Sequence, residues 1–119
     1  MDTKEEELLT GVEETTTSEP FNVEKYSKIG LQFTSAEITS GNGVFTVEGT
    51  INGKDWVALN TLVDNVTNTN SEDLTRVDSK TLSSNSSVLV WLIEPALKAI
   101  RVKVTYTTDG EYSAYVITQ

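Results

Sequence analysis

The stretch FTVEGTINGKDWVAL, residues 45–59, decides the fold class of this chain. In residues 45–51 apolar side chains alternate with polar ones, as in a strand that buries one face. Asn52-Gly53 follows, and this pair favours the positive φ angles of a two-residue type I′ turn. Residues 55–59 are then expected to return as the second strand of a β-hairpin.

The same alternation recurs on both sides of this stretch. Residues 26–34 carry apolar side chains at every second position, and so do residues 100–106. Residues 112–118 are rich in β-branched and aromatic side chains, and Asp109-Gly110 lies between them and the preceding strand. We therefore predict a second hairpin that closes on Asp109-Gly110.

The register of this second hairpin follows from its turn. Closing on two residues pairs Val104 with Tyr115 and Val102 with Ile117, so that the apolar faces of the two strands coincide. The opposite face would then carry Arg101, Lys103 and Tyr112, which we take as candidate partner-binding residues.

Residues 88–93, Val-Leu-Val-Trp-Leu-Ile, are apolar on both faces and suggest a central strand that is covered on both sides, with Trp91 in the core. Residues 74–82 are ambiguous, with a strand that points Val77 inward as one reading. No amphipathic helix of useful length is present. The pattern predicts an all-β fold, a single antiparallel β-sandwich of the jelly-roll kind over residues 21–119.

Residues 1–20 form a separate acidic N-terminal arm in this interpretation. Up to residue 19 they hold seven acidic side chains against one lysine, which accounts for −6 of the net charge of −9. Few of them are apolar, so we expect a flexible arm that orders only on contact with a partner. The candidate contact residues on the arm are Glu5, Glu6, Glu7, Leu8 and Leu9. The basic face of the last hairpin is a candidate for meeting this arm.

The composition argues against catalysis and against several ligand classes. The chain has no cysteine and no histidine, so thiol chemistry and the commonest general base are absent. Glu48 and Asp55 flank the first hairpin, but a solvated face explains them better than a catalytic pair. Residues 64–73 are rich in oxygen ligands without the spacing of a calcium loop, and an ordinary polar loop is the simpler reading. We expect no enzyme and no cofactor.

The charge and hydropathy of the chain indicate which partners and which cellular location to expect. Nucleic acid is disfavoured as a partner, because binding its phosphates needs an excess of basic residues and this chain has a net charge of −9. The longest apolar run is six residues, and the acidic start lacks the features of a secretory signal. We therefore expect a protein made in a cytoplasm, with no membrane segment. Trp56 is expected to pack in the core, although it could also stack on a sugar or anchor an interface, and Tyr26, Tyr112 and Tyr115 are further candidate contacts.

Three segments of the sequence resemble segments of small tailed-phage virion proteins. The 45–59 hairpin, with Gly, Asn-Gly and Trp in order, is similar to a hairpin of small tailed-phage virion proteins and of some discoidin-like and carbohydrate-binding sandwiches. Residues 29–33 resemble the preceding strand of the phage proteins, and residues 98–106 resemble their closing strand. The acidic arm lies outside the resemblance.

The resemblance implies an accessory structural protein of a bacteriophage particle, of the capsid decoration or head-fibre type. Such a protein would be located in the virion, after synthesis in the host bacterial cytoplasm. Its partners would be the major capsid protein or another virion protein, and it would form a homo-oligomer. A carbohydrate-binding β-sandwich module is the alternative function.

Overall fold

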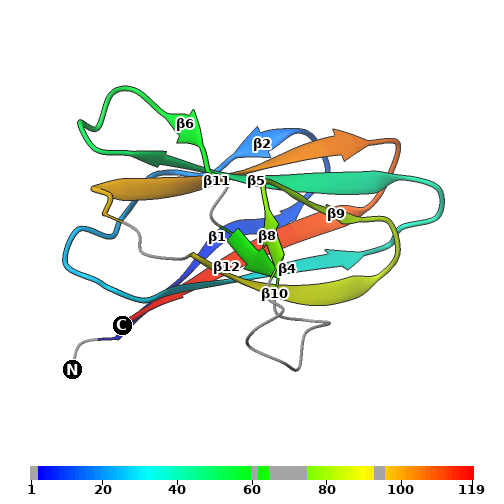
Figure 1. Ribbon diagram of the computed structural model, residues 1–119. Coiled ribbons are helices and arrows are strands. Elements are labelled where there is room, and N and C mark those ends of the chain that lie inside the picture. Colours follow the sequence, from blue (N-terminus) through cyan, green and yellow to red (C-terminus); the bar gives the residue numbers. More distant parts are fainter. Residues whose placement is uncertain (1–2, 60–61, 65–74, 93–95) are drawn as a thin grey trace.

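The computed structural model describes residues 3–59, 62–64, 75–92 and 96–119, and these residues form two antiparallel sheets packed face to face (Figure 1). The first sheet, sheet A, contains β1 (Lys4–Val12), β4 (Ile29–Ala36), β7 (Leu62–Asp64), β8 (Thr75–Val77), β10 (Ser86–Leu92) and β12 (Glu111–Thr118). The second sheet, sheet B, contains β2 (Thr16–Thr17), β3 (Phe21–Asn22), β5 (Asn42–Thr50), β6 (Val57–Ala58), β9 (Lys80–Leu82) and β11 (Ala99–Thr107). The predicted all-β sandwich is confirmed.

The strand order is that of a jelly roll. Sheet A runs β1-β12-β4-β10-β7-β8, and sheet B runs β2-β11-β5-β6, with β3 on β11 and β9 on β5. The first strand of each sheet pairs with a strand from the end of the chain, and consecutive long strands from β4 onward alternate between the sheets. Two interlocked Greek keys produce this arrangement.

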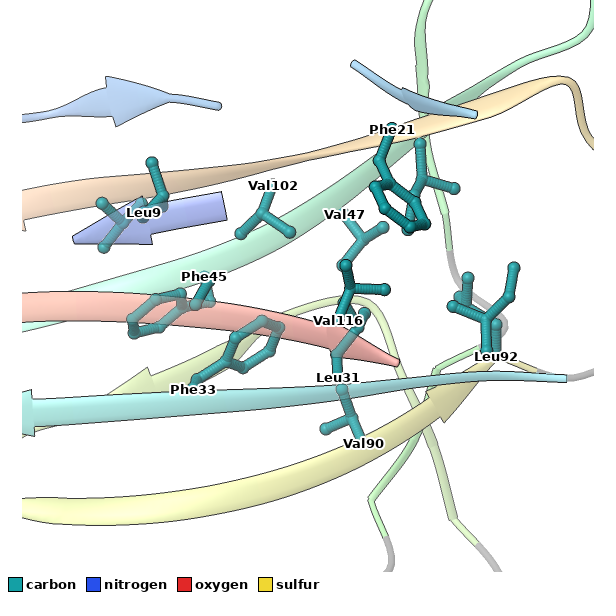
Figure 2. Packing of buried hydrophobic residues seen from close by; sticks show 14 of the residues in the cluster. Leu9, Phe21, Leu31, Phe33, Phe45, Val47, Val90, Leu92, Val102 and Val116 are labelled. Atoms are coloured by element: carbon teal, nitrogen blue, oxygen red, sulfur yellow. The ribbon is translucent and has the colours of Figure 1, made fainter. Parts of the chain in front are cut away.

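The core lies between the sheets and follows the period-two pattern. The inward positions of β4, β5, β10, β11 and β12 are buried, and the outward positions are half-buried or exposed. At its centre the rings of Phe33 and Phe45 stack across the two sheets, with centroids 4.5 Å apart and planes inclined by 10° (Figure 2). The Tyr112 ring meets Phe45 edge-on at 6.1 Å. Burial of these aromatic side chains stabilises the sandwich, because each removes a large apolar area from water.

The predicted hairpin at Asp109-Gly110 is wrong. β11 pairs with β5 in sheet B, whereas β12 pairs with β4 and β1 in sheet A, so the chain crosses from one sheet to the other at this point. Thr108 and Gly110 take positive φ angles of 72° and 114° to make the crossing. The inward face of β12 consequently carries Tyr112, Ala114 and Val116. Apolar residues on both faces of β12 made either register compatible with the sequence.

The hairpin at Asn52-Gly53 is confirmed, but its turn is wider than predicted. β5 pairs with β6 through Glu48 opposite Ala58 and Gly49 opposite Val57, so residues 51–56 form the loop between the two strands. Only Gly53 of the central pair has a positive φ, at 80°. The Asn52 side chain organises the loop in place of a type I′ turn, because its Oδ1 accepts hydrogen bonds from the backbone of residues 54 and 55.

The expectation of a flexible N-terminal arm is also wrong for the described residues. β1 pairs with β12 from Lys4 opposite Thr118 to Val12 opposite Tyr112, and Leu9 is buried in the core (Figure 2). The register shifts by one residue between Glu7 and Leu9, which marks a β-bulge. Because of the bulge, Glu7 lies on the outer face of sheet A and Leu9 on the inner face. Residues 4–12 therefore belong to the sandwich, and a domain boundary at residues 20–21 does not match the sheet.

The placement of Trp91 in the core is wrong. Val88, Val90 and Leu92 of β10 are buried, but Leu89 and Trp91 are 43% and 39% exposed. β10 is central in sheet A, as predicted, yet no described residue covers the outer face of that sheet at this strand. Val77, on β8, packs against the core as predicted.

One end of the sandwich is closed by the Asp109 carboxylate. It accepts hydrogen bonds from the backbone N–H groups of residues 39–41, of which the shortest is 2.8 Å from the nitrogen of Gly41. Desolvation acts to raise the pKa of Asp109, but the three N–H donors outweigh it and hold the pKa below the ordinary value of 3.8. The Asp109 carbonyl oxygen accepts a 2.8 Å bond from the hydroxyl of Tyr112. Burial, and then the nearby Asp109 charge and Tyr106, raise the pKa of Tyr112 above 10.0.

Candidate interaction surface

The outer face of sheet A carries a row of side chains that the strand registers bring together. Glu5 of β1 lies opposite Ile117 of β12, Ile117 lies opposite Gly30 of β4, and Gly30 lies opposite Trp91 of β10. Directly paired residues on adjacent strands are neighbours on the same face of a sheet. The row thus runs from a carboxylate at the sheet edge to an indole near the sheet centre.

A second row lies beside the first, two residues along each strand. Glu7 is opposite Tyr115, Tyr115 is opposite Gln32, and Gln32 is opposite Leu89. Residues two apart on a strand point to the same face, so the two rows are continuous. We call the surface formed by these eight residues the outer groove.

Gly30 lies on the floor of the outer groove and contributes no side chain to it. A Cβ at this position would lie 3.3 Å from Ile117 Cγ2, so the Ile117 side chain packs closely beside the glycine. The hollow has a volume of about 650 Å³ and is lined by the two rows together with the backbone of the same strands. The groove is therefore a shallow depression in a sheet face and not an enclosed ligand cavity.

Four large apolar side chains of the outer groove are exposed to solvent. Ile117 is 47% exposed and Tyr115 is 37% exposed, beside the two β10 residues already described. Contiguous exposed apolar side chains with a polar rim are typical of interaction sites on soluble proteins. The rim here is acidic, since Glu5 and Glu7 are both exposed at the β1 edge.

The predicted contact residues of the N-terminal segment divide between the two faces of β1. Glu5 and Glu7 line the outer groove. Glu6 is exposed and pairs with Val116 on the inward side of the strand. Leu8 is half-buried against the core and Leu9 is buried, so neither is free for a partner while the fold is intact.

The three predicted contact residues of the last two strands do not form one face. Tyr112 has no exposed surface and its ring lies in the core, so its assignment as a contact residue is wrong. Arg101 and Lys103 lie on the outer side of sheet B, where Arg101 Nε is 2.6 Å from Glu48 Oε1. β1 belongs to sheet A and lies away from this basic face, but β2, which is also part of the N-terminal segment, pairs with β11 and places Thr17 opposite Lys103.

Trp56 is half-buried on sheet B rather than in the core. The Arg101 guanidinium carbon lies 4.4 Å from the centroid of its ring, which is a cation–π distance. One ring face is thus occupied by Arg101, and the Trp56 surface open to a sugar is reduced.

The apolar residues of the outer groove were missed because alternation does not say which face of a strand is inward. Both β10 and β12 carry apolar side chains at successive positions, such as Trp91-Leu92 and Val116-Ile117. This doubled pattern is a signal that could have marked a second apolar face. Tyr115 alone was predicted as a contact.

The described residues contain no group of three or more His, Cys, Asp or Glu side chains that could hold a metal ion. The predicted calcium-loop alternative falls on residues 64–73, and residues 65–73 lie outside the described ones. Within the described part of the chain, no helix has the length and hydropathy needed to cross a bilayer.

Comparison with known proteins rests on structure. No protein-family model matches the sequence, and no curated protein matches it. The crystal structure of the SPBc2 prophage-derived protein YomS is similar, with a TM-score of 0.66 over 99% of this chain and 94% of that chain, at 13% sequence identity. At this identity the similarity shows a shared fold, and the fold that this chain shares is that of a prophage-derived protein.

Proposed function

We propose that this chain is a non-catalytic structural component of a bacteriophage particle, an auxiliary or decoration protein that acts through protein–protein contacts. The observation that carries the proposal is the shared fold with a prophage-derived protein over nearly the whole of both chains. The resemblance of three sequence blocks to small tailed-phage virion proteins supports it independently, because it rests on the sequence and not on the fold.

The outer groove supplies the contact surface in this proposal. Trp91 and Tyr115 present rigid aromatic rings, and such residues dominate the binding energy of many interfaces. Leu89 and Ile117 add apolar surface around them. A partner that covers these four side chains would bury their apolar area. Each Å² of apolar area removed from water stabilises the complex by about 25 cal/mol.

Incorporation into particles tests the proposal. Phage particles purified by density gradient would be analysed by quantitative mass spectrometry for the wild-type chain, for Trp91→Glu and for Thr105→Glu. Thr105 is exposed on the outer side of sheet B, so its variant is a matched control for an added charge on a strand.

We expect the wild type and Thr105→Glu in stoichiometric amounts, and Trp91→Glu reduced by about 30-fold, which corresponds to a hot-spot loss of about 2 kcal/mol. A wild-type chain that is present in infected cells but absent from purified particles would refute the proposal.

A carbohydrate-binding module is the second candidate, and the outer groove favours it more than Trp56 does. Trp91 and Tyr115 flank Gln32, so aromatic rings and an amide face the same hollow. Glycan-array binding that disappears in Trp91→Ala would support this function. Binding to no glycan at all would exclude the glycans on the array.

A further inference from the structure

A second exposed apolar surface lies at the tip of the hairpin between β5 and β6. Ile51 is 76% exposed and Val57 is 65% exposed. With the four side chains of the outer groove, they make up the exposed large hydrophobic residues of the described part of the chain. We call residues 51–58 the hairpin tip.

The hairpin tip is held in shape by its own hydrogen bonds. Asn52 Oδ1 accepts from the backbone nitrogens of Lys54 and Asp55 at 2.8 and 2.9 Å, and Asn52 Nδ2 donates to Asp55 Oδ2 at 2.8 Å. The Gly53 nitrogen donates to Thr50 Oγ1 at 3.0 Å. A loop that is ordered before binding loses little conformational entropy when it docks.

The hairpin tip is basic where the outer groove is acidic. Lys54 is exposed, and Lys98 Nζ lies 3.7 Å from where a Cβ of Gly53 would stand, so two ammonium groups flank the apolar tip. The Asp55 carboxylate accepts a hydrogen bond from Asn52 Nδ2 but keeps its negative charge, so Lys54, Lys98 and Asp55 together give this region a net charge of +1. The outer groove combines apolar side chains with Glu5 and Glu7. The two surfaces are thus complementary in both hydropathy and charge.

The two surfaces lie on opposite sides of the sandwich. The loop before β6 rises from sheet B on the side away from sheet A, whereas the outer groove is on the far face of sheet A (Figure 1). They cannot meet within one chain. Each chain can therefore use its hairpin tip on one neighbour and its outer groove on another.

We propose that the outer groove binds the hairpin tip of a second copy of this chain. The contact is heterologous, so repetition produces a ring if the rotation closes and a filament if it does not. This inference rests on the proposal that the groove binds protein, and it names the partner. Two exposed aliphatic residues in the groove favour apolar protein side chains over the hydroxyl groups of a sugar.

A face-to-face dimer of two outer grooves fits the charges less well. Each chain has a net charge of −9, and such a dimer brings two acidic rims together without a basic partner. The hairpin tip instead places Lys54 and Lys98 against the rim. We expect a single short loop docked in a shallow depression to bury less than the roughly 1,200 Å² of a standard interface, so association should be weak and concentration-dependent.

Complementation between two variants tests the proposal on purified protein. Trp91→Thr impairs the groove and keeps a β-branched residue in the strand, and Ile51→Ser impairs the tip. Sedimentation velocity would be measured for each variant and for their equimolar mixture, with circular dichroism to check folding. The average mass of the wild-type species should rise with protein concentration and exceed twice the 13.1 kDa mass of one chain.

Each variant alone should remain monomeric, with association weakened by about 30-fold or more. Their mixture should form dimers and nothing larger, because only one intact tip and one intact groove are left to meet. Dimers of Ile51→Ser alone would overturn the proposal in favour of a face-to-face contact. A wild type that stays monomeric at millimolar concentration would also overturn it, whatever its incorporation into particles.

Charge reversal provides a second, independent set of variants. Glu5→Lys with Glu7→Lys, and Lys54→Glu with Lys98→Glu, should each abolish association, and mixing the two proteins should restore it. Lys25→Glu is the matched control and should associate like the wild type. Failure of the mixture to restore association, with both proteins folded, would show that these charges do not meet.

Discussion

Leu9→Ala is the sharpest test of whether the N-terminal segment is a strand of the sandwich or a tether. Leu9 is 4% exposed and lies in the core beside residues of both sheets (Figure 2). The substitution removes three carbon atoms, each worth about 0.8 kcal/mol when buried. An unfilled cavity would add to this loss, but β1 is an edge strand held on one side by β12 and can move inward. We therefore expect a loss of about 2–3 kcal/mol.

Urea unfolding followed by circular dichroism measures this loss. The midpoint should fall while the m-value stays constant, since the surface exposed on unfolding hardly changes. Leu8→Ala is the matched control, because Leu8 is the neighbouring half-buried residue at the bulge. Leu8→Ala should lower the free energy of unfolding by about 1 kcal/mol or less. A loss below about 0.5 kcal/mol for Leu9→Ala, the range of ordinary surface substitutions, would refute the reasoning and restore the flexible arm.

Three further predictions concern the closed end of the sandwich and its basic face. Asp109→Asn should lower the urea midpoint at neutral pH. The difference from the wild type should shrink as the pH falls below 3.8, because a carboxyl group with a lowered pKa stabilises the fold only while it is ionised. A difference in midpoint that does not depend on pH would contradict this. Gly43→Ala should cost about 1–3 kcal/mol of unfolding free energy, since its Cβ would lie 2.6 Å from the buried Tyr112 ring, and an unchanged thermal midpoint would count against that packing. Arg101→Ala should lower the free energy of unfolding by only about 1 kcal/mol, because the ion pair between Arg101 and Glu48 is partly exposed. A loss above about 3 kcal/mol, measured by urea unfolding, would contradict this.

The fold class could be predicted from the sequence because alternation is a local property. A strand that buries one face needs apolar residues at every second position, and residues 29–36, 42–50 and 99–107 have this pattern. The hairpin at Asn52-Gly53 followed from two adjacent residues in the same way. Its exact turn did not, because a side chain of the loop supplied hydrogen bonds that a type I′ turn would have made through the backbone.

The site was predicted only in part, because membership of a sheet depends on contacts far apart in the sequence. Glu5 and Glu7 were identified from charge, but the bulge before Leu9 decides that they face outward. Trp91 was assigned to the core because an apolar run says nothing about which of its faces is covered. Tyr112 was assigned to the surface by pairing β12 with β11, whereas β12 pairs with β4 and β1 in the other sheet and turns Tyr112 inward.

The sequence by itself therefore determined an all-β sandwich, an acidic first segment and the positions of the main strands, because propensity, alternation and turn chemistry act over a few residues. Only the tertiary structure decided that β11 and β12 belong to different sheets and that residues 4–12 complete one of them. The same long-range pairing placed Gly30 between Ile117 and Trp91 and so created the outer groove. The reason is physical: a strand with apolar residues on both faces is compatible with two registers, and its neighbours in the sheet select one.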